Sequence, residues 1–357
     1  MPARATDGTC LAKLVRMAIP LCRAAQTQCP RMGPGRPPDF DDWKMAILIM
    51  VAILKNRKSK SAQYRFLQEH RRKLRRWLAL DRFPARGTYF ARYARIHRFF
   101  QIAIRLQGIT ACREGVATAR TVSVDKSLLA ARGPQWHARD RQANRMPVGL
   151  HGVDRDSTWS FSTHHGWVQG YSYEVVVTAD KGTVLPLLAS ADTASLSEHV
   201  SFGPKIRQLP KSTRHVLADS GYDNNDYGDA VERDEHGHST GRHFLCAPNP
   251  RSGRIAPPAD PGLQLWQRQA RQRRRQRLAY YRSQAGRHLY RRRSQSVEPF
   301  NEWFKSLFGL DQTVWHRGLA NNQTQFLAAL FCYQLLLRFN HRTGHDNGQI
   351  QWILDTL

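Results

Sequence analysis

Cysteine is sparse in this 357-residue sequence, and the cysteines that occur lie far apart. They are Cys10, Cys22, Cys29, Cys112, Cys246 and Cys332, and no two of them form a C-x-x-C pair. A zinc module needs clustered cysteine ligands and a small disulfide-rich domain needs a dense cysteine framework, so both classes are excluded. The pattern favours a reducing compartment, and we expect a cytoplasmic protein.

Long hydrophobic runs are also missing. The two longest, Met45–Leu54 and Phe326–Leu337, are shorter than the roughly 20 apolar residues with which a helix crosses a bilayer. Near the N-terminus, Lys13 and Arg16 interrupt any apolar stretch of the kind found in signal peptides. We therefore expect no membrane association, and we interpret both runs as buried helices of a soluble protein.

Acidic residues are few as well, since 28 Asp and Glu stand against 55 Lys and Arg, a net charge of +27. With 41% hydrophobic residues the chain is nonetheless expected to fold. The excess positive charge calls for a polyanionic partner, and we expect nucleic acid. The charge is unevenly placed: residues 1–100 carry +16, residues 101–260 carry +1, and residues 261–297 hold eleven arginines and no acid. Two basic flanks therefore enclose a nearly neutral centre.

The first basic flank predicts a small all-α DNA-binding domain at residues 39–115. It follows an N-terminal extension and linker at residues 1–38, which ends in a Gly/Pro cluster that cannot continue a helix. Asp41 or Asp42 can cap the first helix of the domain, over residues 43–54, and Ser61 can cap a second, which exposes Arg71–Arg76. A third short helix follows, and three such basic helices are typical of helix-turn-helix-like DNA-binding bundles.

Beyond residue 115 the pattern changes to short β-branched runs, which predict strands. The predicted strands are residues 121–125, 157–163, 171–179, 183–190, 214–219 and 243–246, with a helix over residues 196–209. Two more helices are expected over residues 297–308 and 324–338, the latter packed under the sheet. Strands joined first by turns and then by helices predict an α/β fold, with a mixed sheet flanked by helices.

This α/β core is expected at residues 116–247 and 294–345. Residues 248–293, which lie between its two parts, form a predicted basic insertion rich in proline and then in arginine. Residues 346–357 remain as a C-terminal tail. The arginine-dense part of the insertion indicates contact with phosphate groups, and binding that weakens with salt.

Three carboxylates are candidates for catalysis. Asp125 and Asp219 each end a predicted strand, where the sheet fixes the backbone and the side chain projects into a cleft. Glu298 lies in the first turn of the helix that follows the basic insertion. Three carboxylates brought together would repel each other unless a cation neutralised them, and oxygen ligands of this kind suit Mg²⁺. Two such ions can activate a water and stabilise the leaving oxygen in phosphodiester cleavage.

Several motifs together resemble the DDE transposases of bacterial insertion sequences, in the group with a ribonuclease-H-like catalytic core and a Y-R-E-K signature. The most specific is Leu217-Ala-Asp-Ser-Gly-Tyr-Asp223, which is similar to the segment that bears the second acid of the family. Glu298-x6-Lys305 has the family's spacing from third acid to lysine. Tyr290-x2-Arg293 is also present, but four residues rather than three separate Arg293 from Glu298. Glu302 is a rival third acid that lacks the spacing to lysine.

Other segments extend this resemblance over most of the chain. Arg36-Pro-Pro38 with the apolar helix after it, and Arg86–Arg92, look like the N-terminal helical domain of the family. Asp125 takes the place of the first acid, and Gly166–Tyr171 looks like an aromatic-Gly-Tyr segment. Trp167, Tyr171 and Tyr222 can either stack on a displaced base or pack in the core.

The resemblance implies a transposase that binds the ends of its element and carries out Mg-dependent phosphodiester hydrolysis and DNA strand transfer. Asp125, Asp219 and Glu298 would hold two Mg²⁺ ions per site, with Mn²⁺ as a substitute. The expected DNA-binding residues are Lys305, Arg293, Tyr290, Arg273, Arg274, Arg275 and Arg92. The expected partners are double-stranded element ends and target DNA at the bacterial nucleoid, bound by a homodimer or larger synaptic complex. A metal-dependent nuclease of the same fold, or an inactive DNA-binding derivative, remains the alternative.

Overall fold

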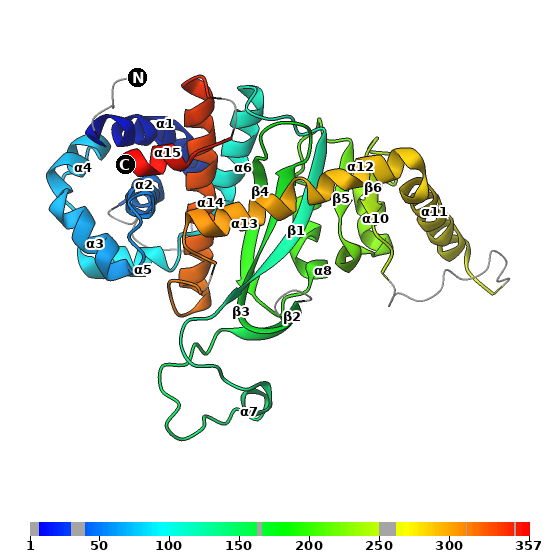
Figure 1. Cartoon of the computed structure of the whole chain (residues 1–357), viewed down its shortest axis with the longest axis horizontal. Helices are drawn as coiled ribbons and strands as arrows, with labels where there is room; N and C mark the ends of the chain where they lie inside the picture. Colours follow the sequence, from blue (N-terminus) through cyan, green and yellow to red (C-terminus); the bar gives the residue numbers. More distant parts are fainter. Residues whose placement is uncertain (1–6, 30–39, 163–165, 250–261, 312, 346–347) are drawn as a thin grey trace.

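The computed structural model describes residues 7–29, 40–162, 166–249, 262–311, 313–345 and 348–357. The predicted Gly/Pro boundary before residue 39 and most of the prolines of the insertion lie outside these ranges. In Figure 1 the N-terminal helices gather at one end, the sheet stands in the middle, and the helices of the insertion lie at the other end.

The strands of the described residues form one mixed sheet. They are β1 Thr121–Ala130, β2 Thr158–Ser162, β3 Gly166–Thr178, β4 Pro186–Thr193, β5 His215–Ala218 and β6 His243–Cys246. Their order is β2-β3-β1-β5-β6, and β4 also pairs with β3. β1, β5 and β6 run parallel, whereas β3 is antiparallel to β1, β2 and β4. This confirms the predicted fold class, a mixed sheet flanked by helices and preceded by a helical region, consistent with a ribonuclease-H-like core.

β1 runs on to Ala130, so the prediction that Asp125 ends a strand is wrong. The antiparallel pairing with β3 continues as far as Ala130 and Gly170, whereas the parallel pairing with β5 stops at Ser123 and Leu217. Gly170 permits this extension, because a Cβ there would lie 1.9 Å from the carbonyl oxygen of Leu129. Asp125 therefore stands in mid-strand, just beyond the point where β1 loses its parallel neighbour.

Helices occupy the described residues before the sheet. They are α1 Asp7–Gln28, α2 Asp42–Leu54, α3 Lys60–Glu69, α4 Arg71–Leu78, α5 Arg86–Tyr93 and α6 His97–Arg113. Asp41 is the N-cap of α2 as predicted, although its side chain makes no cap hydrogen bond. Ser59, and not the predicted Ser61, caps α3 by accepting from the Ala62 N–H. Arg71–Arg76 belong to the separate helix α4, because α3 ends at Glu69 and His70 lies between the two helices.

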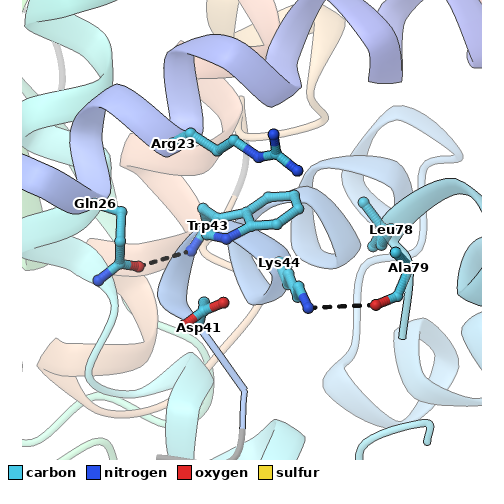
Figure 2. A pocket seen from close by; sticks show the side chains of 7 residues that line it. All are labelled: Arg23, Gln26, Asp41, Trp43, Lys44, Leu78 and Ala79. Atoms are coloured by element: carbon cyan, nitrogen blue, oxygen red, sulfur yellow. Dashed lines mark hydrogen bonds between the residues drawn. The ribbon is translucent and has the colours of Figure 1, made fainter. Parts of the chain in front are cut away.

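α1, which lies within the predicted extension, is fastened to α2 around Trp43. Figure 2 shows the Arg23 side chain lying over the Trp43 ring and the Gln26 side chain accepting from the Trp43 N–H. The guanidinium is 4.8 Å from the centre of the ring. On the other side, Lys44 donates to the carbonyl of Ala79 at 3.4 Å. An open cavity of about 410 Å³ lies among these residues, in the helical region and apart from the three candidate acids.

The chain between the strands and after them is mainly helical. The remaining elements are α7 Ala138–Gln142, α8 Glu198–Ser201, α9 Gly203–Ile206, the 3-10 turn η1 Ser220–Tyr222, α10 Asn225–Glu232, α11 Leu265–Arg282, α12 Gln284–Ser294, α13 Val297–Leu307, α14 Leu319–Arg342 and α15 Gln351–Thr356. The single helix predicted over residues 196–209 is wrong, since two short helices stand there. Gly203 and Pro204 interrupt the run, because proline lacks the N–H that a continuous helix requires.

α14 connects the sheet to the N-terminal helices through one continuous core. It packs on β4, α6 and α2, and most of its side chains are buried. The Gln334 side chain donates to the carbonyls of Ile104 and Pro186, so it joins α6 to the entry of β4. The helices at residues 39–115 thus share their core with the sheet. The domain limits given above remain a prediction.

The connection between β1 and β2 projects from the sheet, and Figure 1 shows it with α7 near its tip. Its base is fixed to the rest of the molecule. Asp154 is buried and accepts from the Gly318 N–H at 3.2 Å, and Asp156 accepts from the Leu319 N–H at 2.8 Å. Both carboxylates therefore bind free N–H groups at the start of α14. None of the helices in the described ranges is long and apolar enough to cross a membrane.

The ion pair between α6 and α14 supplies a test of the shared core. Arg338 is buried, and it donates to Glu114 at 2.9 Å, as does the exposed Arg342 at 2.6 Å. Partial burial of Glu114 opposes its ionisation, but these bonds hold its pKa down to about 2. We expect Glu114→Gln to lower the free energy of unfolding by about 2–3 kcal/mol, because it leaves Arg338 buried and unpaired. Urea denaturation with the control Arg342→Gln, which should cost about 0.5 kcal/mol, checks this.

A buried histidine predicts how stability depends on pH. His316 lies 3.0 Å from the Tyr93 hydroxyl, and burial, aided by the charges of Lys60 and Arg132, lowers its pKa to about 3. Between about pH 6.5 and 3 the His316 imidazole therefore stays neutral in the folded protein, whereas in the unfolded chain it binds a proton. Stability falls with falling pH across this window, by up to about 1.4 kcal/mol per pH unit from this group. His316→Gln should flatten the curve between pH 6.5 and 4.5, as thermal unfolding would show; parallel curves for the two proteins would contradict the assignment.

Candidate active site

The register of two parallel strands brings Asp125 and Asp219 together. Ser123 on β1 pairs with Leu217 on β5, so the residues two positions further along each strand are Asp125 and Asp219. Asp219 directly follows β5 and caps the turn η1, where its carboxylate accepts from the Gly221 N–H at 2.9 Å. The side chain of Asp125 is only 16% exposed, whereas that of Asp219 is 42% exposed. The sheet thus supplies one buried and one accessible carboxylate.

Glu298 comes to the same place on a helix. α12 and α13 follow each other across one side of the sheet, as Figure 1 shows, and Glu298 lies in the first turn of α13. Val297, Phe300 and Phe304 of α13 are buried in the main core, which fixes the orientation of the helix. Glu298 itself is 53% exposed. The rival Glu302 lies further along the same helix, on the solvent side.

A single guanidinium group lies between the three acids. Arg293 approaches Asp125 Oδ1 at 3.0 Å and Asp219 Oδ2 at 3.9 Å through Nη2, and Glu298 Oε1 at 2.9 Å through Nη1. It is the last arginine of α12, and the chain turns through Gln295 and Ser296 before α13 begins. This turn accommodates the four residues between Arg293 and Glu298, so the spacing that departs from the family pattern still places the two side chains in contact.

Asn301 is a fourth member of the site that sequence reasoning missed. Its Nδ2 donates to Asp125 Oδ2 at 2.9 Å, and its Oδ1 accepts from the Tyr173 hydroxyl at 2.9 Å. It is 8% exposed, one turn after Glu298 on α13. That spacing is the signal that could have found it, because residues three apart share a helix face.

Lys305 and Tyr290 lie at the edge of this group and contact the backbone of the strands. Lys305 Nζ donates to the carbonyl of Leu128 on β1 at 3.3 Å. Tyr290 donates to the carbonyl of Ala218, the residue before Asp219, at 3.1 Å. Burial lowers the pKa of Lys305, while the neighbouring charges of Asp125 and Glu302 act against this. The two side chains therefore bind the backbone of β1 beyond Asp125 and the last residue of β5 before Asp219.

Burial and crowding of charge alter the proton affinity of the sheet acids. Burial raises the pKa of Asp125 to about 7, since the attraction of Arg293 only partly offsets it and Asp219 and Glu298 repel its charge. Burial also raises the pKa of Asp219, against the opposing effect of Arg293. For Arg293 burial alone would lower the pKa, but the charges of Asp125 and Asp219 raise it. The surroundings thus favour the neutral form of both sheet acids, and the positive charge of Arg293 opposes this.

Within the described ranges, no group of three or more His, Cys, Asp or Glu side chains is close enough to hold a metal ion directly. The acids nevertheless share one cationic group, and their donor atoms are all oxygen, which is what Mg²⁺ requires. The chemistry of these donors therefore suits a divalent cation, although the three acids do not lie close enough to hold one directly while Arg293 stands between them. The fit requires that Arg293 give way.

Three of the other predicted DNA contacts, Arg273, Arg274 and Arg92, are engaged in ion pairs within the protein. On α11, Arg273 binds both oxygens of Asp229 and Arg274 binds Asp223 at 2.8 Å. Arg275 lies on the same helix. Arg92 pairs with Asp42 at the start of α2. The charges of Arg273, Arg274 and Arg92 thus belong to ion pairs between segments of the protein, which a count of charge along the sequence cannot reveal.

The three aromatic residues divide between surface and core. Trp167 is 67% exposed and packs edge-on against Phe161 across the β2–β3 pair. Tyr171 and Tyr222 are buried, and Tyr222 donates to Glu174 at 2.9 Å beneath the turn that carries Asp219. Of the three, only Trp167 is exposed enough to stack on a base.

The comparisons with known proteins agree with this geometry. A family model described as Transposase DDE domain matches residues 117–335, more than half of the chain. The matched region contains all three acids as well as Arg293, Asn301 and Lys305. No curated protein and no solved structure matches the sequence. By this match, and with three acids from β1, β5 and α13 gathered at one place, the chain belongs to the transposase DDE domain family.

Proposed function

We propose that the protein binds the ends of its own insertion element and catalyses hydrolysis and strand transfer of DNA with Asp125, Asp219 and Glu298. The observation that carries the proposal is the contact of all three acids with Arg293. Family membership implies DNA as the substrate. Crowding three carboxylates at one place costs the fold free energy, because their negative charges repel each other, but the arrangement suits a site that binds cations.

The proposed cofactor is Mg²⁺, replaceable by Mn²⁺, with two ions held by the three carboxylates. When bound, such ions supply an activated water and a counter-charge for the leaving oxygen. Lys305 would hold the phosphate beside the scissile bond, since its amino group stands at the edge of β1 close to Asp125. Tyr290 would act through the backbone, by fixing Ala218 and with it the position of Asp219.

We assign the DNA backbone contact of the insertion to the junction of α11 and α12. An open hollow of about 730 Å³ there is lined by Arg282, Gln284, Ala285, Arg287, His288 and Arg291. None of these lining residues is acidic, and Arg287 and Arg291 lie one turn apart on the exposed side of α12. Arg273 and Arg274 are poorer candidates because acids already bind them. A phosphate chain in the hollow would run along the helix that carries Arg293.

Strand transfer joins two DNA ends to a target, so we further propose that a homodimer or larger assembly acts in a synaptic complex at the bacterial nucleoid. Each copy would contribute one carboxylate site. The basic helices α3, α4 and α5 would engage the terminal repeats, since α4 exposes Arg71, Arg72, Lys73, Arg75 and Arg76 opposite the buried Leu74 and Leu78.

The catalytic assignment is tested with purified protein, end-bearing DNA and Mg²⁺. The wild type should give cleaved and joined products, and Asp219→Asn should lower the rate of both by about 10³-fold or more, because the amide keeps the cap but loses the charge. Asp226→Asn removes an exposed carboxylate a few residues away and should change little.

The product pattern separates the alternatives. Cleavage without joining would indicate a nuclease of the same fold, and binding without cleavage would indicate an inactive DNA-binding derivative. Full activity of Asp219→Asn would show that the acids have another role.

The DNA interface is tested by salt dependence. The double variant Arg287→Gln/Arg291→Gln should bind DNA more weakly, and the slope of log affinity against log salt should fall by about 2, because two phosphate contacts are lost. The matched control is Arg273→Gln/Arg277→Gln, which removes two arginines that bind Asp229 on α10. Fluorescence anisotropy across a salt series measures both. A larger change of slope in the control would move the interface to α11.

A further inference from the structure

Asp125 is bound at both of its carboxylate oxygens by side chains of the protein. Oδ1 accepts from Arg293 Nη2 at 3.0 Å, and Oδ2 accepts from Asn301 Nδ2 at 2.9 Å. The two donors come from different helices, α12 and α13, on either side of the turn at residues 295–296. A cation that binds Asp125 must therefore displace one donor or share its oxygen.

The Asn301 contact is built to persist. The amide is 8% exposed, and its oxygen accepts from the hydroxyl of Tyr173, which is wholly buried on β3. The Tyr173 ring is held in turn by Phe304 and Phe326, whose ring centres lie 5.5 and 6.1 Å away. With Tyr173 donating to Oδ1, the nitrogen of the amide must face Asp125. The chain Tyr173, Asn301, Asp125 is thus a fixed row of hydrogen bonds.

The Arg293 contact is built to exchange. Its guanidinium divides itself among three acids, two of which, Asp219 and Glu298, are 42% and 53% exposed. The Nε–H of Arg293 is buried and finds no acceptor in the part of the chain that the structure describes. The long flexible stem of Arg293 and its one unsatisfied donor favour exchange, whereas Asn301 moves only by breaking the hydrogen bond from Tyr173.

We propose that Asn301 is a positioning residue that fixes Oδ2 of Asp125, and that Arg293 is the exchangeable partner of Oδ1, which a divalent cation displaces. This inference rests on the proposed function, since it takes the three acids as cation ligands. A guanidinium with charge +1 and an ion with charge +2 compete for the same oxygens, so each lowers the affinity of the site for the other. Once displaced, Arg293 is available to a phosphate of the bound DNA.

The proposed roles of Arg293 and Asn301 predict that replacing them changes the affinity for a divalent cation in opposite directions. Removal of Arg293 should strengthen cation binding, because a competing positive charge is lost. Removal of the Asn301 amide should weaken it, because Asp125 loses its orientation; loss of a partner that orients a metal ligand costs roughly 10–100-fold in affinity. A purely structural role for either residue would not give this pair of signs.

The test is isothermal titration calorimetry, in which MnCl₂ is added to the full-length protein without DNA. Arg293→Gln should bind Mn²⁺ about tenfold more tightly than the wild type. Arg292→Gln is the matched control: it removes the neighbouring arginine, which pairs with Asp180, and should stay within about twofold of the wild type. Asn301→Leu should bind Mn²⁺ at least about tenfold more weakly than the wild type. Tyr173→Phe leaves Asn301 in place but frees its amide, so its affinity should lie between those of Asn301→Leu and the wild type. Near-UV circular dichroism confirms that each variant is folded.

The outcomes separate this inference from the proposed function. Mn²⁺ binding by the wild type with unchanged or weaker binding by Arg293→Gln overturns the competition and leaves metal dependence standing. Unchanged binding by folded Asn301→Leu and Tyr173→Phe overturns the positioning role. Binding by neither the wild type nor Arg293→Gln overturns both the inference and the metal dependence. Tighter binding by Arg293→Gln without any DNA cleavage by the wild type supports the inference and contradicts the proposed catalysis.

Discussion

The positive charge of Arg293 allows three carboxylates to lie close together in a partly buried site, because it offsets their mutual repulsion. Asp125 is fixed by β1, Asp219 by the cap of η1 and Glu298 by α13, so none of them can move far from the others. Without the guanidinium the three negative charges would repel each other unopposed, and the pKa of Asp125, which burial already raises, would rise further. The turn between α12 and α13 matters for the same reason, since it sets how far Arg293 reaches.

The rest of the fold determines where these groups stand. Parallel pairing of β1 with β5 aligns the two sheet acids, while the antiparallel partner β3 carries β1 past the end of β5 and supplies Tyr173 behind Asn301. α13 is held by apolar side chains in the main core, whereas α12 contacts a much smaller cluster formed by Ala179, Leu217 and Leu245. The site therefore joins a firmly packed part, with all three acids, to the less deeply packed helix that carries Arg293.

Order along the chain carried the prediction of two of the acids. Asp219 precedes a Gly-Tyr turn, and Glu298 stands seven residues before Lys305 on one helix. The structure places both beside Arg293, and their catalytic role stays a prediction. The fold class followed from β-branched runs and their connections, and the limits of β6 were predicted correctly. Strand length was not predictable in the same way, because β1 beyond Asp125 is decided by its partner β3 and by the missing side chain of Gly170.

Contacts between distant residues could not be predicted. Nothing near Asn301 in the sequence indicates Tyr173, which is far away in the chain and meets it only once the sheet and α13 are assembled. The arginines of α11 formed a uniform basic run in the sequence, yet Asp223 and Asp229 neutralise several of them, so their number overstated the charge offered to a partner. Arg293 belonged to the same basic run, but it contacts the three candidate acids, because its helix ends beside them.

The projecting connection between β1 and β2 has a consequence for how this chain can change over evolution. Both ends of the connection are fixed to the rest of the protein: the Ala131 N–H donates to the Gln169 carbonyl, and Asp154 accepts from the Gly318 N–H. Val148, near the tip, is fully exposed. Residues added at the tip lengthen a loop whose ends are already joined, and each doubling of such a loop costs only about 0.6 kcal/mol. The exposed tip of this arm is therefore free to change in length while the register of β1, on which Asp125 depends, stays the same.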